Sequence, residues 1–161
     1  MDPLTSRKQV IVVEDDLNDY TLIDHALRDA GLSCRVRRVD NAEELNEELL
    51  RLAPDLVLCD HAVANWDSCA VLEQVRAFQP NTPFVVVSGG LSDDTQAELI
   101  SRGADACVSK AELARLVPIV QQTLERHAED QRKRVEEIRR SLPPMPANAR
   151  RRNRLDLRAC A

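Results

Sequence analysis

The sequence predicts an α/β fold, a doubly wound parallel sheet with helices on both of its faces. Short apolar runs alternate with segments of helical spacing, which is typical of parallel strands that are buried on both faces. The runs are 10–13, 56–59, 84–87 and 106–109. With a more polar strand near 34–39, they give five β-α units in strict alternation, joined by right-handed crossovers. Hydrophobic residues make up 43% of the 161 residues and aromatic residues only 2%, so we expect one domain with an aliphatic core.

The first two units occupy residues 9 to about 52. A strand over 9–14 leads to a helix over about 17–30, which Gly31 ends. We expect one face of this helix to carry Leu22, Ile23, Ala26, Leu27 and Ala30. The strand 34–39 has arginines among its apolar residues, which indicates an edge strand. Asn41, followed three residues later by Glu44, predicts the start of a helix that runs to about Leu52.

The remaining units end in a long helix. After the strand 55–60 and a loop, Asp67 or Ser68 caps a helix that carries Val71, Leu72, Val75 and Phe78. The strand 83–88 precedes the Gly89-Gly90 turn, a helix from Ser92 to about Arg102 that Gly103 ends, and a strand near 105–109. Residues 111–116 form a lead-in turn, and Pro118 fits the first turn of a final helix that continues to about Arg140.

Composition restricts the class of protein. The five cysteines lack metal-ligand spacing, and no segment resembles a signal peptide or a membrane span, so we expect a reduced, cytoplasmic protein without membrane attachment. Residues 141–161 hold five arginines and one aspartate, so a net charge of −5 leaves −9 for the rest. An acidic domain argues against DNA binding by the folded part.

Five polar residues follow or end the predicted strands. They are Glu14, Asp15, Asp60, Ser88 and Lys110. Because ligands bind at the carboxyl ends of the strands in open α/β sheets, these residues predict one site for a metal ion and a phosphoryl group. Carboxylates favour Mg²⁺. Asp60 is the candidate nucleophile, with magnesium, Lys110 and Ser88 each serving one phosphoryl oxygen, and Gly89-Gly90 leaves room for the phosphate donor.

These motifs carry a family resemblance over about residues 8–128. The segments Val-Val-Glu-Asp-Asp, Pro-Asp-Leu-Val-Leu-Cys-Asp, Val-Val-Val-Ser-Gly and Gly-Ala-Asp-Ala-Cys-Val-Ser-Lys resemble the receiver domain of bacterial two-component response regulators. The resemblance implies a flavodoxin-like sheet of order 2-1-3-4-5 and phosphotransfer to Asp60 from a histidine kinase or histidine phosphotransfer protein. It also implies that Asp15 and Asp60 bind the metal directly, Glu14 through water, and Ala62 through its backbone carbonyl.

The chain departs from the family pattern near the site. The loop 61–68 lacks the usual methionine-proline pair, Cys107 stands at the aromatic switch position, and Ala111 replaces the proline after the lysine. None of these changes removes a catalytic group. The simplest roles for nearby residues are that Asp16, Asp19 and Asp24 cap or solvate the first helix, and that His61 is merely exposed. Trp66 serves either loop packing or a partner contact.

The leading hypothesis is a signalling receiver that acts by protein contact and catalyses only its own phosphorylation and dephosphorylation. The alternative is a pseudo-receiver that binds without switching. A metal-dependent phosphatase is disfavoured because position 62 offers no general acid. We expect a receiver at 8–128, a helical extension at 129–141 and a disordered basic tail at 142–161, with no DNA-binding output domain. The downstream partner is not identifiable.

The helical extension predicts a parallel homodimer. Its seam follows spacings of four and three, with charges of both signs on Glu129, Arg132, Glu136 and Arg139 beside it. The seam residues are Leu124, Ala128, Gln131, Val135, Ile138 and Leu142.

Overall fold

The computed structural model describes residues 7–143, which contain seven strands, five α-helices and one 3₁₀ helix. The strands are β1 (Lys8–Val13), β2 (Cys34–Val39), β3 (Leu56–Cys59), β4 (Ala62–Val63), β5 (Trp66–Asp67), β6 (Phe84–Ser88) and β7 (Ala106–Ser109). The helices are α1 (Leu17–Asp29), α2 (Ala42–Arg51), α3 (Ser68–Phe78), α4 (Asp93–Ser101), the 3₁₀ helix η1 (Lys110–Arg115) and α5 (Leu116–Ser141).

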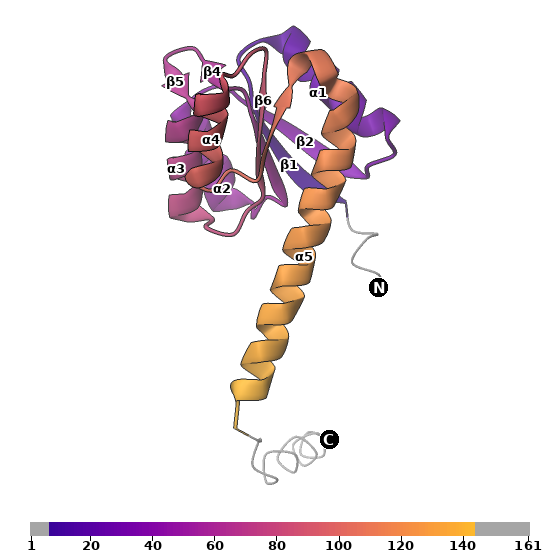
Figure 1. The fold of residues 1–161 in the computed structure, drawn as a ribbon, viewed down its shortest axis with the longest axis vertical. Coiled ribbons are helices and arrows are strands. Elements are labelled where there is room, and N and C mark those ends of the chain that lie inside the picture. Colours follow the sequence, from indigo (N-terminus) through magenta and orange to yellow (C-terminus); the bar gives the residue numbers. More distant parts are fainter. Residues whose placement is uncertain (1–6, 144–161) are drawn as a thin grey trace, which may run out of the picture. The chain divides into compact units, whose positions relative to one another are not determined.

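Five of the strands form one parallel sheet in the order β2-β1-β3-β6-β7 (Figure 1). Counted among these five, that is the predicted order 2-1-3-4-5, and β2 is an edge strand as predicted. Strands β4 and β5 form a separate antiparallel hairpin, with Val63 opposite Trp66, inside the segment that the sequence predicts as a loop. Two residues a strand are too few for a recognisable alternation.

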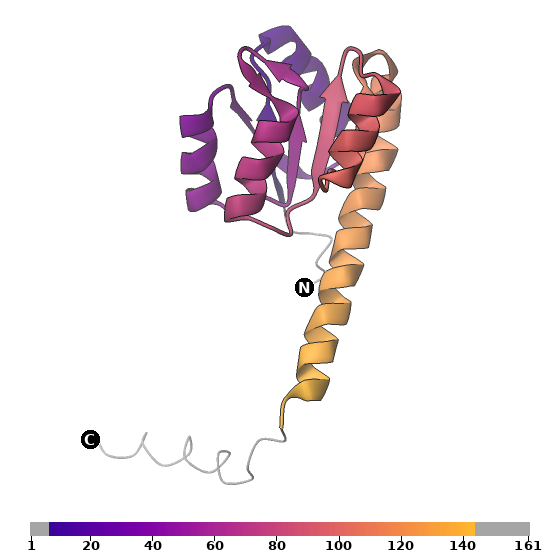
Figure 2. The same ribbon diagram turned by 60° about the vertical axis from the view of Figure 1, so that its left-hand side comes forward.

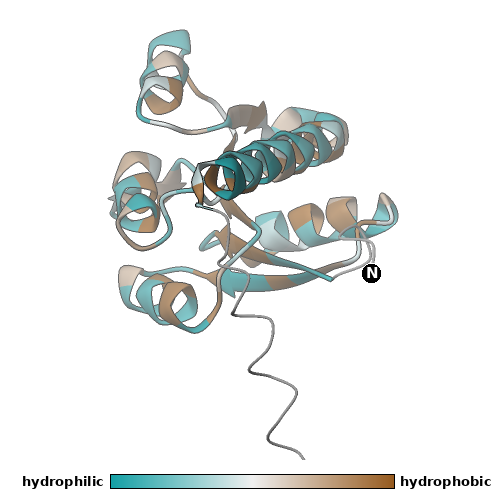
Figure 3. Ribbon diagram, turned by 90° about the horizontal axis from the view of Figure 1, so that it is seen from below, coloured by the Kyte–Doolittle hydropathy of each residue, from teal (hydrophilic) through white to brown (hydrophobic). Residues whose placement is uncertain are grey.

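Helices cover both faces of the sheet. The core on one face joins the sheet to α2, α3 and α4, and the core on the other face joins it to α1 and the beginning of α5. Figure 2 shows α2 and α3 side by side, and Figure 3 shows α2, α3 and α4 in a row on one side of the strands, with α1 on the other. The strands β1, β3 and β6 are buried throughout their apolar residues, which explains their uninterrupted apolar runs.

The predicted caps begin and end these helices. Asp16, Asn41, Asp67 and Ser92 each accept a hydrogen bond from a backbone N–H in the first turn of α1, α2, α3 and α4. Such a cap contributes about 1 kcal/mol to helix stability. Gly31 and Gly103 follow α1 and α4 with φ of +71° and +105°, a region that favours glycine.

Three residues of the predicted apolar faces lie at the surface, namely Leu22, Ala30 and Phe78. Ala30 is the C-cap residue that follows α1. Leu22 is 55% exposed, because Ile23 and Leu27 face the sheet from α1 and Leu22 points about 100° away from Ile23 on the helix. Phe78, the last residue of α3, is 41% exposed, whereas Val71, Leu72 and Val75 are buried. The apolar face is therefore narrower than the sequence predicts.

Helix α5 begins with the predicted proline in its first turn and continues to Ser141. Leu116 and Val120 are buried in the core shared with α1. The chain divides into two compact units, residues 1–127 and residues 128–161. Most of the predicted disordered tail, from residue 144 onward, lies outside the described residues.

Candidate functional site

The carboxyl ends of three strands of the sheet bring acidic residues and one lysine together. Glu14 follows β1, Asp60 follows β3, and Lys110 follows β7. Oxygens of Glu14, Asp15 and Asp60 lie within 4.8 Å of one another. The Lys110 ammonium donates to Glu14 Oε2 at 2.8 Å and to Asp60 Oδ2 at 3.0 Å. Four of the predicted site residues, Glu14, Asp15, Asp60 and Lys110, therefore meet at one edge of the sheet. Together with Asp19, which also contacts Lys110, we call them the acidic cluster.

Glu14 is completely buried, and burial raises the pKa of its carboxyl group. Hydrogen bonds from Lys110 and from the Asp16 N–H, at 3.0 Å, oppose this increase. Burial by itself lowers the pKa of Lys110, but its hydrogen bonds to Asp19, Glu14 and Asp60 outweigh that effect and raise the pKa above its ordinary value. Lys110 therefore stays a cation beside Asp60.

Asp19 also belongs to the cluster, which corrects its interpretation as a capping or solvated residue. Its Oδ2 accepts from the Lys110 ammonium at 2.5 Å, so three carboxylates surround one lysine. Asp16 caps α1 as expected, and Asp24 pairs with Arg28 on the same helix. An acid in the first turn of a helix is so common that the sequence has no signal for this contact across 91 positions.

Asp15 is the exposed member of the cluster and also contacts the hairpin. Its Oδ2 accepts from the Ala64 N–H at 3.1 Å. Ala64 has a φ of +50°, a left-handed conformation that is strained for alanine. Ala62 begins the same hairpin and pairs with Asp67. The role of its carbonyl as a metal ligand stays a prediction.

His61, next to Asp60, is partly buried and tied to the start of α3, so it is not the exposed side chain that the sequence predicts. Its Nδ1 lies 2.8 Å from the hydroxyl of Ser68, which is buried, and the Ser68 N–H donates to the His61 carbonyl at 3.1 Å. These bonds close the base of the hairpin.

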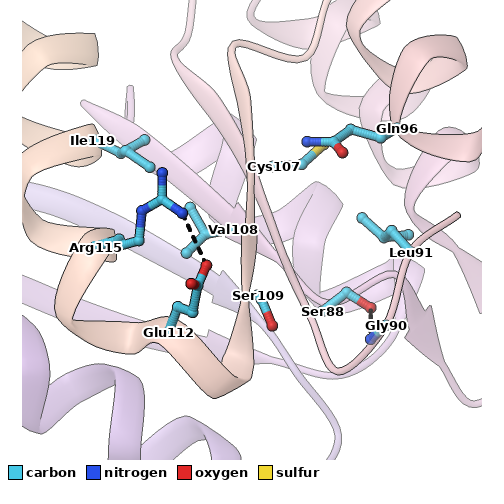
Figure 4. A pocket seen from close by; sticks show the side chains of 10 residues that line it. All are labelled: Ser88, Gly90, Leu91, Gln96, Cys107, Val108, Ser109, Glu112, Arg115 and Ile119. Atoms are coloured by element: carbon cyan, nitrogen blue, oxygen red, sulfur yellow. Dashed lines mark hydrogen bonds and ion pairs between the residues drawn. The ribbon is translucent and has the colours of Figure 1, made fainter. Parts of the chain in front are cut away.

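Ser88 ends β6 and is buried, and its hydroxyl accepts from the Gly90 N–H at 3.4 Å. It pairs in register with Ser109, the neighbour of Lys110, so it lies at the same edge of the sheet. Ser88 and Cys107 line a pocket of about 390 Å³ (Figure 4). The other lining residues are Gly90, Leu91, Gln96, Val108, Ser109, Glu112, Arg115 and Ile119.

Comparison with known proteins agrees with this arrangement. The family model of the response regulator receiver domain matches residues 10–121. The transcriptional regulatory protein ZraR of Klebsiella oxytoca is 32% identical over 95 residues, which are 59% of this chain and 21% of that protein. The DNA-binding transcriptional regulator NtrC of Escherichia coli K12 is 27% identical over 126 residues, or 78% of this chain and 26% of that protein. The chain thus spans about a quarter or less of these relatives.

Solved structures show the same fold. The receiver domain of NtrX from Brucella abortus matches with a TM-score of 0.66 and 27% identity, covering 72% of this chain and 98% of that one. A CheY-like receiver domain protein from Methanospirillum hungatei JF-1 matches with a TM-score of 0.68 and 20% identity, covering 78% and 99%. No helix among residues 7–143 is long and apolar enough to span a membrane. With the family model covering well over half of it, this chain belongs to the response regulator receiver domain family.

Proposed function

We propose that this chain is a phosphorylation-dependent signalling receiver, which accepts a phosphoryl group on Asp60 from a histidine kinase or histidine phosphotransfer protein in the cytoplasm. The observation that carries this proposal is the acidic cluster itself. Asp60 lies directly after the central strand β3, and its Oδ2 is hydrogen-bonded to Lys110 beside two further carboxylates of strand β1's end. The carboxylates of this cluster outnumber Lys110, the lysine that three of them contact.

The donor set fits a divalent cation that prefers oxygen. Glu14, Asp15 and Asp60 offer carboxylate oxygens within 4.8 Å of one another, and only Asp15 is exposed. We propose that Asp15 and Asp60 hold Mg²⁺ directly, Glu14 through water, and the Ala62 carbonyl as a further ligand. Bound Mg²⁺ would neutralise charge on the carboxylates and on the phosphoryl oxygens.

The chain's own groups then perform the transfer. An Asp60 oxygen forms a bond to phosphorus while the phosphorus–nitrogen bond of the donor phosphohistidine breaks. The electron pair of the broken bond stays on the departing imidazole nitrogen, which takes up a proton from solvent. Lys110 exchanges one of its three bonds to carboxylates for a bond to a phosphoryl oxygen, which places a positive charge where negative charge develops. The Ser88 hydroxyl donates to another oxygen.

The departures from the family pattern favour a second candidate, a pseudo-receiver that binds a partner without switching. Cys107 lines an open pocket where the family carries an aromatic side chain, so no ring is present there to change position. Output in either case is by protein contact.

Intact-mass measurement after treatment with acetyl phosphate and Mg²⁺ tests the proposal. We expect a single added phosphoryl group on the wild type, none on Asp60→Asn, and full labelling of the control Asp93→Asn, whose side chain is exposed at the start of α4. An unlabelled wild type supports the pseudo-receiver, and labelling that persists in Asp60→Asn shows that the nucleophile is another residue.

The heptad pattern of α5 also predicts a homodimer. This stays a prediction, which sedimentation of the chain with and without residues 129–161 tests.

A further inference from the structure

The β4–β5 hairpin connects β3 to α3 beside the acidic cluster (Figure 1). It begins two residues after Asp60, and each of its strands has only two residues. A hairpin of this size is not stable by itself, so its conformation depends on contacts with the rest of the domain. Those contacts lie at its middle, its base and its tip.

The middle of the hairpin is anchored in the core. Val63 is completely buried, and Trp66, which lies opposite Val63, packs against the core that the sheet shares with α2, α3 and α4. Asp67, the last residue of β5, caps α3 by accepting from the Ala70 N–H at 2.8 Å. These contacts attach the two strands to the domain, but none of them reaches a carboxylate of the acidic cluster.

The base of the hairpin is closed by the pair His61 and Ser68. Nδ1 of His61 lies 2.8 Å from the Ser68 hydroxyl, and the Ser68 N–H donates to the His61 carbonyl at 3.1 Å. Because Ser68 is completely buried, its hydroxyl cannot exchange His61 for water, and loss of a partner is costly for a buried polar group. The pair therefore holds the two ends of the hairpin together, directly after Asp60.

The tip of the hairpin holds one carboxylate of the acidic cluster. The turn is Ala64-Asn65, and the Ala64 N–H donates to Asp15 Oδ2 at 3.1 Å. With a φ of +50°, the first position of such a turn usually carries glycine, so alanine is strained here. Strain of this kind persists only where surrounding contacts fix the backbone. The bond restricts Asp15, which is otherwise an exposed side chain.

This bond leaves Asp15 able to bind a cation. A carboxylate has about four acceptor sites on its two oxygens, and the Ala64 N–H occupies one of them. The Ala62 carbonyl, the further ligand proposed for Mg²⁺, belongs to the same hairpin. Ligands that are already oriented by their neighbours bind metals more tightly, and removal of such neighbours weakens binding by roughly 10- to 100-fold.

We propose that His61 and Ser68 are positioning residues for the magnesium site. By closing the base of the hairpin, they hold the Ala64 N–H against Asp15 and keep the Ala62 carbonyl in place before the cation arrives. Neither side chain is itself a ligand. The inference rests on the proposed function, because it gives both residues a role toward the Mg²⁺ of the acidic cluster.

Magnesium titration of the full chain, followed by amide-resolved nuclear magnetic resonance, tests this role. We expect Ser68→Ala and His61→Ala to weaken Mg²⁺ binding by roughly 10-fold. His61→Asn should stay within about 2-fold of wild type, because its amide can place a polar atom where Nδ1 lies. Thermal unfolding in EDTA checks that each variant is folded at the temperature of the titration.

Thr82→Val is the matched control. It also removes a buried hydroxyl, which donates to the Pro54 carbonyl at 3.5 Å. Thr82 and Pro54 precede β6 and β3, so this bond lies at the opposite edge of the sheet from the acidic cluster. We expect Thr82→Val to bind Mg²⁺ as wild type does, even where it lowers the melting temperature as much as Ser68→Ala.

Amide hydrogen exchange in EDTA tests the hairpin without the metal. The Ala64 N–H should be protected from exchange in wild type and in Thr82→Val. It should lose this protection in Ser68→Ala, which opens the base, and in Asp15→Ala, which removes the acceptor.

The proposal is overturned if Ser68→Ala and His61→Ala bind Mg²⁺ as tightly as wild type, because the pair then only stabilises the start of α3. An equal loss of affinity in Thr82→Val also overturns it, since general destabilisation then explains the effect. A wild type that binds no Mg²⁺ overturns both the metal site and this role. A wild type that binds Mg²⁺, shows the expected losses in the variants and takes no phosphoryl group overturns only the proposed phosphotransfer.

Discussion

At the scale of single residues, the acidic cluster is organised around one ammonium group. Lys110 donates to Asp19, Glu14 and Asp60, and a lysine has three N–H donors, so this arrangement leaves none for a phosphoryl oxygen. One of these bonds must break before Lys110 can stabilise an incoming group. Asp19, in the first turn of α1, therefore competes with the phosphoryl group for the ammonium group of Lys110.

Replacing Asp19 with asparagine should therefore speed phosphorylation of Asp60. The expected gain is roughly 2- to 5-fold, since a partly exposed ion pair contributes about 0.5–1 kcal/mol. The measurement is the initial rate of labelling by acetyl phosphate and Mg²⁺. Asp16→Asn is the control, because asparagine also caps α1 and Asp16 does not contact Lys110. A rate equal to or below that of wild type contradicts this competition.

A second residue-scale prediction concerns the lifetime of the phosphorylated protein. Ala62 and Gly90, two residues after Asp60 and Ser88, have no side-chain group that holds an attacking water. Ala62→Asn should speed hydrolysis by on the order of 10-fold, because its amide can position that water. The decay of the phosphorylated mass after removal of the donor measures this. Ala62→Val, which adds bulk without a polar group, should not speed it.

Most of the site was predictable from the sequence, and its exceptions have a common cause. Glu14 and Asp60 follow the buried strands β1 and β3, and Lys110 follows the partly buried edge strand β7. Because parallel strands end at the same edge of the sheet, the position of these residues directly after the strands is enough to predict that they meet. Asp19 and the bond between His61 and Ser68 depend on how a helix and a hairpin pack against that edge. No local pattern encodes that packing.

At the scale of elements, helix α5 is buried against the domain at its beginning and exposed to solvent towards its end. Val120 is 1% exposed and packs with α1 and the sheet, whereas Val135, four turns later, is exposed. The sequence predicts the helix and its length, since its spacing is continuous to about Arg140. The predicted seam is longer than its exposed part, because Leu124 is partly buried and packs against the core.

Two matched substitutions in α5 should differ in their effect on stability. Val120→Ala removes buried methyl groups and should lower the free energy of unfolding by about 1–2.5 kcal/mol. Val135→Ala on the same helix should change it by less than about 0.5 kcal/mol. Urea unfolding of the full chain measures both. Equal losses would mean that Val135 is also buried in the protein in solution.

At the scale of the whole molecule, the carboxylates of the acidic cluster repel one another, and a bound cation reduces this repulsion. Glu14, Asp15 and Asp60 lie close together, and burial of Glu14 already raises its pKa. A cation that binds only the folded chain shifts the unfolding equilibrium by mass action.

Magnesium should therefore raise the melting temperature. The expected stabilisation is roughly 1–3 kcal/mol when free Mg²⁺ exceeds its dissociation constant by about 10- to 100-fold. Thermal unfolding with millimolar Mg²⁺, against EDTA, measures it. Asp15→Ala should lose the effect, and Asp93→Ala should keep it. The same melting temperature with and without Mg²⁺ would count against a metal at this cluster.

The edge strand β2 has a consequence for solubility. A parallel sheet has unpaired backbone groups along its outer strands, where another molecule's strand can add and start a growing aggregate. Arg35 and Arg37 are exposed on β2, and Arg37 is tied to Glu48 of α2 at 3.0 Å. Two copies that approach through β2 would bring these guanidinium groups together. The arginines of β2 therefore oppose the addition of another copy of the chain at this edge of the sheet.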